Sequence, residues 1–247
     1  VELRDMEEAV DHNTRLIATT LVSNVNGYLS DVKALADLAH AHGAYLYVDA
    51  IQGVGAVPVD VRAMGIDFAA CSTFKWLMGV KGFGFLYVRE DLQGTVVKAS
   101  QPSGGVSLNY PPWTEAAAAG DEISFSTRSG PEQYEVSYPS YEGAVCAQES
   151  LAYILRLGGH NIRDHARSLT DRLHEEMPAM GYPSITPRHN ESSIVAFEIP
   201  DPGAAMARLR QAGVHVAMRF GNKMRISPSV YNNQEDVDRL LDALKAV

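Results

Sequence analysis

The hydrophobic and polar positions of the first half of the chain alternate between the patterns of strand and helix. Nearly continuous apolar runs, typical of buried parallel strands, lie at residues 15–22, 45–48, 68–72 and 83–88. Between the first two runs, apolar residues recur at helical spacing from Ser30, a good N-cap, to Gly43. Strands separated by helical connections predict an α/β fold with part of a doubly wound, mainly parallel sheet. Ligands of such sheets bind beyond the carboxyl ends of the strands.

Helical spacing dominates the second half. It predicts helices at residues 141–157, 161–177 and 204–212, and a last helix capped by Asn233. Short strands are expected at residues 193–199, 214–218 and 224–227. A Gly- and Pro-rich stretch and an irregular region, together residues 101–139, separate these elements from the first half. We therefore expect two domains, an α/β domain of residues 1–140 and a smaller α+β domain of residues 141–247.

Composition argues against several classes of protein. The chain has 247 residues, 46% of them hydrophobic, which is enough for a sizeable core. Its formal net charge of −9 disfavours nucleic acid as a partner, because phosphates bind clustered Lys and Arg. No apolar run approaches the roughly 20 residues that span a bilayer, so no membrane partner is expected. Cys71 and Cys146 fall in apolar segments as packing residues, which suits a reducing, cytoplasmic compartment.

No metal site is expected. His40 and His42 lie near the end of the first predicted helix, at Gly43. Solvent exposure or contact with the helix dipole explains both histidines there. No carboxylate of the sequence can be placed beside them.

A lysine and a carboxylate follow two of the predicted strands. Asp49 ends the strand at residues 45–48, and Lys75 comes three residues after Ser72. In pyridoxal phosphate chemistry, a lysine forms a Schiff base with the cofactor and a carboxylate keeps the pyridine nitrogen protonated. Taken singly, Asp49 could be a turn cap and Lys75 a surface charge. Their joint placement at strand ends favours a pyridoxal phosphate site.

The order and spacing of several segments resemble the class V aminotransferase family of fold-type I pyridoxal phosphate enzymes, which includes cysteine desulfurases. The segments are residues 22–27, 48–52, 72–75, 82–88 and 224–232. The resemblance runs from about Val1 to the C-terminus. It implies that residues 1–140 are the remainder of a large cofactor-binding domain that lacks the family's N-terminal segment. Residues 141–247 would be the small C-terminal domain.

The resemblance implies a cofactor role for five residues. Lys75 would carry the Schiff base and move the α-proton of the substrate. Asp49 would pair with the pyridine nitrogen. Gln52 would touch the phenolic oxygen of the ring, and Asn24 would lie near the same oxygen or near the substrate. Ser72 would bind the cofactor phosphate.

The resemblance also implies how a small amino acid substrate is held. Arg225 matches the arginine that binds the α-carboxylate, since a planar guanidinium fork fits a carboxylate in two bonds. Asn24 would assist it. Arg128 and Arg219 are weaker candidates for a second carboxylate.

One position departs from the family pattern, and one loop points to a dimer. Phe74 stands where many relatives have a histidine that binds the phosphate, so another donor should replace it. Ser137 and Tyr138 match a loop that reaches across a homodimer to the phosphate of the other subunit, and either hydroxyl could serve. The resemblance therefore implies a homodimer.

The expected activity is that of an aminotransferase. Epimerisation and β-elimination, including C–S bond cleavage, remain as alternatives because all begin with the same chemistry. Residues 213–224 contain no cysteine, which argues against a persulfide route of desulfuration. An alternative of another class is a truncated, inactive homologue that acts as a folded interaction module. The intact Asp49, Gln52 and Lys75 argue against it.

Overall fold

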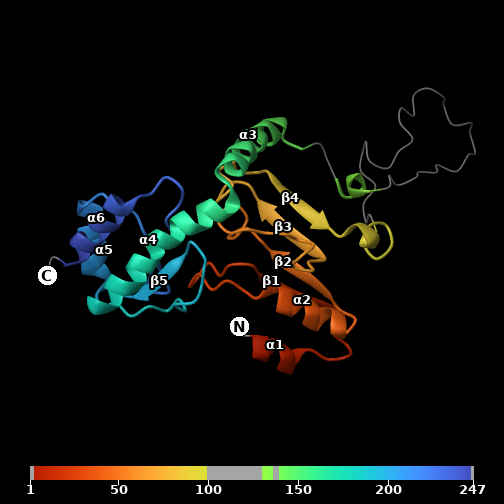
Figure 1. Cartoon of the computed structure of the whole chain (residues 1–247), viewed down its shortest axis with the longest axis horizontal. Coiled ribbons are helices and arrows are strands. Elements are labelled where there is room, and N and C mark those ends of the chain that lie inside the picture. Colours follow the sequence, from red (N-terminus) through yellow and green to blue (C-terminus); the bar gives the residue numbers. More distant parts are fainter. Residues whose placement is uncertain (1–2, 99–129, 136–138, 246–247) are drawn as a thin grey trace, which may run out of the picture.

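The computed structural model describes residues 3–98, 130–135 and 139–245 (Figure 1). Its first sheet contains four strands in the order β1-β2-β3-β4, namely Leu16–Thr20, Tyr45–Asp49, Phe68–Ser72 and Gly84–Val88. The first three are parallel, and β4 runs antiparallel to β3. The predicted α/β fold with a mainly parallel sheet is confirmed. Asp49 and Ser72 end neighbouring parallel strands, so they lie at the same edge of the sheet.

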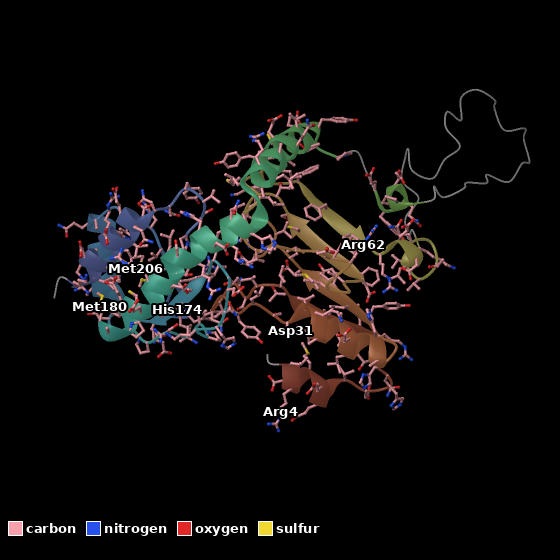
Figure 2. All side chains as sticks on the ribbon, in the orientation of Figure 1. Arg4, Asp31, Arg62, His174, Met180 and Met206 are labelled. Carbon is pink, nitrogen blue, oxygen red and sulfur yellow. The ribbon has the colours of Figure 1, made fainter. Side chains whose placement is uncertain are left out.

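Helix α2 (Val32–Ala41) connects β1 to β2 and packs an apolar stripe into the core of this sheet. The predicted N-cap at Ser30 is wrong by one residue. Asp31 caps the helix, since its carboxylate accepts a hydrogen bond from Ala34 N at 3.0 Å (Figure 2). Ser30 Oγ instead donates to Thr20 O at 2.7 Å, which ties the approach to the helix onto β1.

Three short elements before residue 140 were not predicted. Helix α1 (Leu3–Ala9) buries none of its residues fully, although Leu3 and Met6 pack against the core. The 3₁₀-helix η1 (Glu90–Leu92) follows β4. A second 3₁₀-helix, η2 (Pro131–Tyr134), lies in the short described range of residues 130–135.

The second half combines helices with a small antiparallel sheet. Its helices are α3 (Tyr141–Leu157), α4 (Gly159–Ala179), α5 (Pro202–Gln211) and α6 (Gln234–Lys245). Its strands β5 (Val195–Glu198), β6 (Ala217–Arg219) and β7 (Lys223–Ile226) pair in the order β5-β7-β6. Asn233 caps α6 as predicted, since its Oδ1 accepts from the backbone of Glu235 and Asp236 at 2.9 and 3.2 Å.

The apolar side chains form two clusters. One lies under the first sheet and α2, and the other surrounds Phe197 between the second sheet and helices α4, α5 and α6. Ile154 and Ile162, from α3 and α4, pack in the first cluster although they follow residue 140. The proposed division into residues 1–140 and 141–247 stays a prediction.

The loop of residues 23–27 joins the two halves. Gly27 has a φ of +73°, and a Cβ there would lie 1.8 Å from Ile194 O. Ser192 Oγ donates to Gly27 O at 2.6 Å. The contact requires glycine both for its conformation and for its lack of a side chain. It holds the loop that carries Asn24 against the second half of the chain.

A buried carboxylate links α2, β2 and β4. Asp67 accepts hydrogen bonds from Leu46 N at 2.7 Å, from His40 Nε2 at 2.9 Å and from Arg89. His40 is therefore explained by its hydrogen bond to Asp67. Among the described residues, no group of three or more His, Cys, Asp or Glu side chains could hold a metal ion. No described helix has both the length and the apolar character to cross a membrane.

Candidate active site

Lys75 lies in a tight turn directly after β3. The buried Thr73 fixes the start of this turn, since its Oγ1 lies 3.0 Å from Val80 O and 3.1 Å from Phe83 O. Met78 N donates to Lys75 O at 2.8 Å, and Gly79 N donates to Thr73 O at 2.8 Å. Met78 takes a positive φ of +55° to close the turn. The backbone that carries Lys75 is therefore held on both sides.

The side chain of Lys75 lines a cavity of about 400 Å³. The other residues lining it come from the loops after β1, β2 and β3 and from the region of β6 and β7; they are Asn24, Gln52, Phe74, Trp76, Met78, Arg219, Arg225, Ser227, Ser229 and Tyr231. The fold thus brings together five residues predicted from the sequence: Asn24, Gln52, Lys75, Arg225 and the weaker candidate Arg219. Among the described residues, the lining holds three basic side chains and no carboxylate, so the cavity favours an anionic ligand.

The electrostatic surroundings lower the pKa of Lys75. Burial is the largest cause, and the charges of Arg225 and Arg219 act in the same direction. The negative charge of Asp49 opposes them. The Phe74 ring, whose centroid lies 5.9 Å from Lys75 Nζ, adds a weak preference for the charged amine. A lowered pKa increases the neutral, nucleophilic fraction of a lysine.

Asp49 is coupled to Lys75 by charge but lines a different cavity. Its Oδ1 accepts a hydrogen bond from Ile51 N at 3.0 Å, so it also caps the turn after β2. With Cys71 and Ser72 it lines a second cavity of about 480 Å³. The segment from Ser72 to Lys75 contributes to both cavities. The structure therefore places the predicted site residues in two neighbouring cavities.

Gln52 is held in place by a residue to which the sequence assigned no role. Gln52 is buried, and its Oε1 accepts a hydrogen bond from Trp76 Nε1 at 3.2 Å. Gly55, with a φ of +92°, lets the backbone approach Trp76, because a Cβ there would lie 2.8 Å from Trp76 O. The only indication in the sequence that Trp76 contributes to the site is its position directly after Lys75.

Arg225 lies on β7 and faces the loop that carries Asn24. Its Nη1 donates to Asn24 O at 2.6 Å, while its buried Nε has no hydrogen-bond partner in the described part of the chain. Burial lowers the pKa of Arg225, and the charge of Arg219 lowers it further. No described carboxylate forms an ion pair with Arg225 within 4.0 Å. The guanidinium therefore retains donors for an anion.

Three further lining residues come from the segment after β7. Ser227 ends the strand that the sequence predicted, Ser229 and Tyr231 follow it, and Tyr231 is largely exposed. Ser227 and Tyr231 lie in the C-terminal segment that carries the family resemblance. Nothing in the sequence selects any of the three hydroxyl groups on chemical grounds, because such groups are common in loops.

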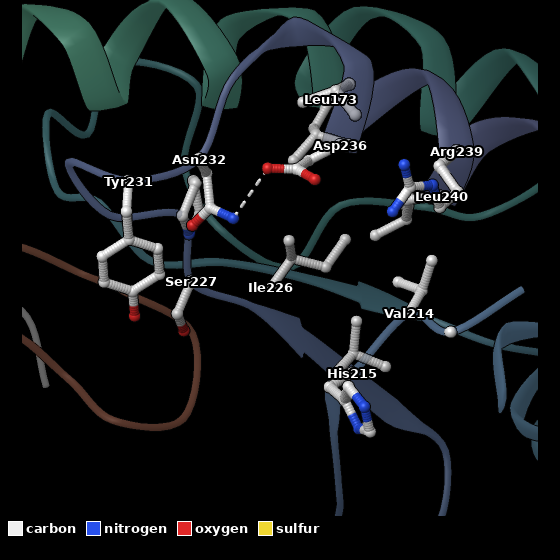
Figure 3. A pocket seen from close by; sticks show the side chains of 14 residues that line it. Leu173, Val214, His215, Ile226, Ser227, Tyr231, Asn232, Asp236, Arg239 and Leu240 are labelled. Carbon is white, nitrogen blue, oxygen red and sulfur yellow. Dashed lines mark hydrogen bonds between the residues drawn. The ribbon is translucent and has the colours of Figure 1, made fainter.

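Another cavity, of about 350 Å³, shares the lining residues Ser227 and Tyr231 with the Lys75 cavity (Figure 3). Helix α6 and the end of β7 contribute to its lining. Two of its polar groups are paired, since Asn232 Nδ2 donates to Asp236 Oδ2 at 3.0 Å, and its described lining contains no lysine. The Lys75 cavity therefore remains the candidate site.

The two cysteines do not contribute to the Lys75 cavity. Burial, aided by the charge of Asp49, raises the pKa of the Cys71 thiol to about 11, which disfavours its nucleophilic form. The expectation that Cys146 is a packing residue is wrong. Cys146 is exposed because it lies on the outer face of α3, whose buried residues are Gly143, Ala147 and Ile154.

Three predicted residues, Arg128, Ser137 and Tyr138, lie outside the described residues. Their proposed contacts with the substrate or the cofactor phosphate stay predictions.

Comparison with known proteins supports the family suggested by the sequence. A probable cysteine desulfurase of Methanothermobacter thermautotrophicus is 30% identical over 98% of this chain and 62% of its own length. An uncharacterized aminotransferase of Bacillus subtilis is 26% identical over 99% of this chain and 62% of its own length. The apo structure of a cysteine desulfurase from Thermococcus onnurineus NA1 superposes with a TM-score of 0.85. It is 26% identical and matches 99% of this chain and 62% of that one.

The chain spans about 62% of the length of these relatives. The model of the family described as aminotransferase class-V matches residues 1–240, which is nearly the whole chain. Its match includes the segments of Asp49, Lys75 and Arg225 on which the sequence resemblance rested. The chain therefore belongs to the class V aminotransferase family.

Proposed function

We propose that this chain forms part of a pyridoxal phosphate-dependent enzyme that acts on an α-amino acid. The observation that carries the proposal is the Lys75 cavity, where an amine of lowered pKa and the donor-rich Arg225 face the same space. An amine that attacks a carbonyl and a guanidinium that binds a carboxylate are the groups that such a reaction requires. Pyridoxal phosphate is the cofactor of this family.

The donor set of the site fits this cofactor. Lys75 supplies the amine, and Asp49 supplies a carboxylate whose charge acts on it. Ser72 supplies a hydroxyl for the phosphate at the end of the next strand. Phe74 donates no hydrogen bond, so the phosphate needs donors beyond Ser72. Bound pyridoxal phosphate would act as an electron sink that weakens the bonds at the α-carbon of an amino acid.

The residues of the chain would orient the substrate and move its proton. Arg225 binds the α-carboxylate, and its hydrogen bond to Asn24 O fixes the direction of the guanidinium. Lys75 Nζ accepts the α-proton and returns it, because a lowered pKa suits a general base. Trp76 keeps Gln52 directed into the cavity through its hydrogen bond to Oε1.

Of the three reaction classes that the sequence left open, the names of the relatives support two. Transamination was the first expectation from the sequence, and one relative is named as an aminotransferase. Other relatives are named as cysteine desulfurases, which favours cleavage of a C–S bond. If this chain cleaves such a bond, we propose direct β-elimination. The lack of a cysteine in the Lys75 cavity and the raised pKa of Cys71 support that route.

A product screen on the full-length protein tests the proposal. The protein is incubated with a panel of amino acids, with and without 2-oxo acids. A new amino acid that appears only when a 2-oxo acid is present indicates transamination. Release of sulfide, ammonia and a 2-oxo acid from a sulfur amino acid alone indicates β-elimination. Neither product, together with no absorption band of bound cofactor, would support the inactive homologue instead.

A further inference from the structure

Two arginines face the Lys75 cavity from neighbouring strands. In the register of the β6–β7 pair, Arg225 lies opposite Ala217, and Arg219 lies opposite Lys223. Ala217 and Arg219 are two residues apart, so Arg219 shares a sheet face with Arg225 and is its diagonal neighbour. Both arginines line the cavity. The tight turn through Phe220 and Gly221 fixes the register that makes them neighbours.

The two guanidinium groups repel each other, and no described acid neutralises them. Burial lowers the pKa of Arg225, and the charge of Arg219 lowers it further. Neither arginine forms an ion pair within 4.0 Å with a described carboxylate. Glu198, on β5, lies opposite Lys223 and does not line the cavity. One hydrogen bond, to Asn24 O, satisfies only one of the five N–H donors of Arg225.

We propose that the substrate is an α-amino acid that carries a second anionic group on its side chain. This inference rests on the proposed function of the same cavity. Two like charges that face one small cavity without a protein counterion become favourable when a dianionic ligand lies between them. A dicarboxylic amino acid is the simplest member of this class.

The burial of the two arginines indicates which of them binds the α-carboxylate and which binds the side-chain anion. Arg225 is half-buried, and Arg219 is exposed. Arg225 also has a larger effect than Arg219 on the pKa of Lys75. Since Lys75 acts at the α-carbon, the α-carboxylate is expected on Arg225. Arg219, at the open side of the cavity, would bind the side-chain anion.

Ligands without an amino group test this inference apart from catalysis. Binding of succinate, a dicarboxylate, and of butyrate, a monocarboxylate of similar length, is measured by calorimetry on the full-length, cofactor-loaded protein. We expect succinate to bind more tightly. Arg219→Ala should weaken succinate binding by about ten- to a hundredfold, as for the loss of a charge-assisted hydrogen bond, and leave butyrate binding within about twofold. Arg219→Lys should restore part of the succinate affinity.

Lys223→Ala is the matched control. Lys223 lies opposite Arg219 on β7 but does not line the cavity, so its loss removes a nearby positive charge without touching the site. It should leave the binding of both ligands unchanged. Equal binding of succinate and butyrate by the unmodified protein, or equal weakening by Arg219→Ala and Lys223→Ala, would overturn the inference.

The same experiment distinguishes this inference from the proposed function. Protein that binds no pyridoxal phosphate at Lys75, yet loses its succinate preference in Arg219→Ala, would refute the proposed function and support the dianion site. Protein that binds the cofactor at Lys75 but shows no preference for succinate would refute the dianion site alone.

Discussion

Asp49 has two separable roles at the scale of single residues. Its carboxylate accepts a hydrogen bond from Ile51 N, which is a structural role, and its charge raises the pKa of Lys75, which is an electrostatic one. Of the two roles that the sequence left open, the structure shows the turn cap, and the pairing with the pyridine nitrogen stays a prediction. A substitution that keeps the hydrogen-bond acceptor and removes the charge isolates the electrostatic role.

Asp49→Asn is such a substitution. The negative charge of Asp49 favours a proton on Lys75 Nζ, so its removal should lower the pKa of that nitrogen, as a free amine or as a Schiff base, and move the pH titration of the cofactor absorption to lower pH. A spectroscopic pH titration measures the shift. Asp49→Ala, the control, also loses the bond to Ile51 and should destabilise the fold by about 0.5–1.5 kcal/mol. A titration that moves to higher pH in Asp49→Asn contradicts the prediction.

The cysteines allow a second prediction at this scale. We expect neither Cys71→Ser nor Cys146→Ser to abolish any release of sulfide from cysteine, since neither thiol lines the Lys75 cavity. Cys146→Ser should also leave stability within about 0.5 kcal/mol, because the residue is exposed. Cys71→Ser should destabilise by about 1–3 kcal/mol, because it buries a hydroxyl in place of a thiol. If sulfide release disappears in either variant, that cysteine takes part in the reaction, which would support the persulfide route.

Hydrophobic patterns along the chain predicted most helices and strands and several residues of the Lys75 cavity. They failed where the pairing between strands decides which residues form a strand. The bounds of β3 and α3 match the expectation to the residue. The strand expected at residues 214–218 is instead β6, Ala217–Arg219. Val214 and Val216 do pack against the second core. However, β7 begins only at Lys223, and its backbone pairs only with Ala217–Arg219 of the preceding segment. The residues before Ala217 therefore do not form part of the strand.

The same reason limits prediction of the site. Strand ends indicated Asp49, Ser72 and Lys75 in advance, because parallel strands end at one edge of a sheet. Arg219 and Arg225 lie on the same face of the sheet because of the register between β6 and β7. Hydrophobic periodicity alone does not predict that register. The role of Trp76 depends on a contact with Gln52, 24 positions earlier in the chain.

At the element scale, the loop of residues 23–27 gives a sharp stability test. Gly27→Ala should destabilise the protein more than Gly43→Ala, by at least about 2 kcal/mol in denaturant unfolding. Both glycines have a positive φ, near +70°, so both variants share the backbone penalty of about 1–2 kcal/mol. Only at Gly27 would a Cβ collide with Ile194 O, whereas nothing lies within 4 Å at Gly43. Equal destabilisation of the two variants would show that the loop does not depend on this contact.

At the scale of the whole molecule, the homodimer implied by the sequence stays a prediction. The described residues offer Ser72 but no side-chain donor at Phe74 for the phosphate. A hydroxyl from Ser137 or Tyr138 of a second copy would supply one. Ser137→Ala or Tyr138→Phe should then weaken cofactor binding by about ten- to a hundredfold. A monomer at micromolar concentration with full cofactor affinity, measured on the full-length protein, would rule out the shared site.

In the proposed enzyme, Lys75 is the amine that binds pyridoxal phosphate. The most direct measurement is borohydride reduction of the cofactor-loaded, full-length protein, followed by peptide mapping. We predict that the cofactor is found on the peptide that contains Lys75. We also predict that Lys75→Arg, which keeps the positive charge of the turn, removes the label while the far-UV circular dichroism is unchanged. Label on another lysine, with Lys75 unmodified, would show that Lys75 is not the amine that binds the cofactor.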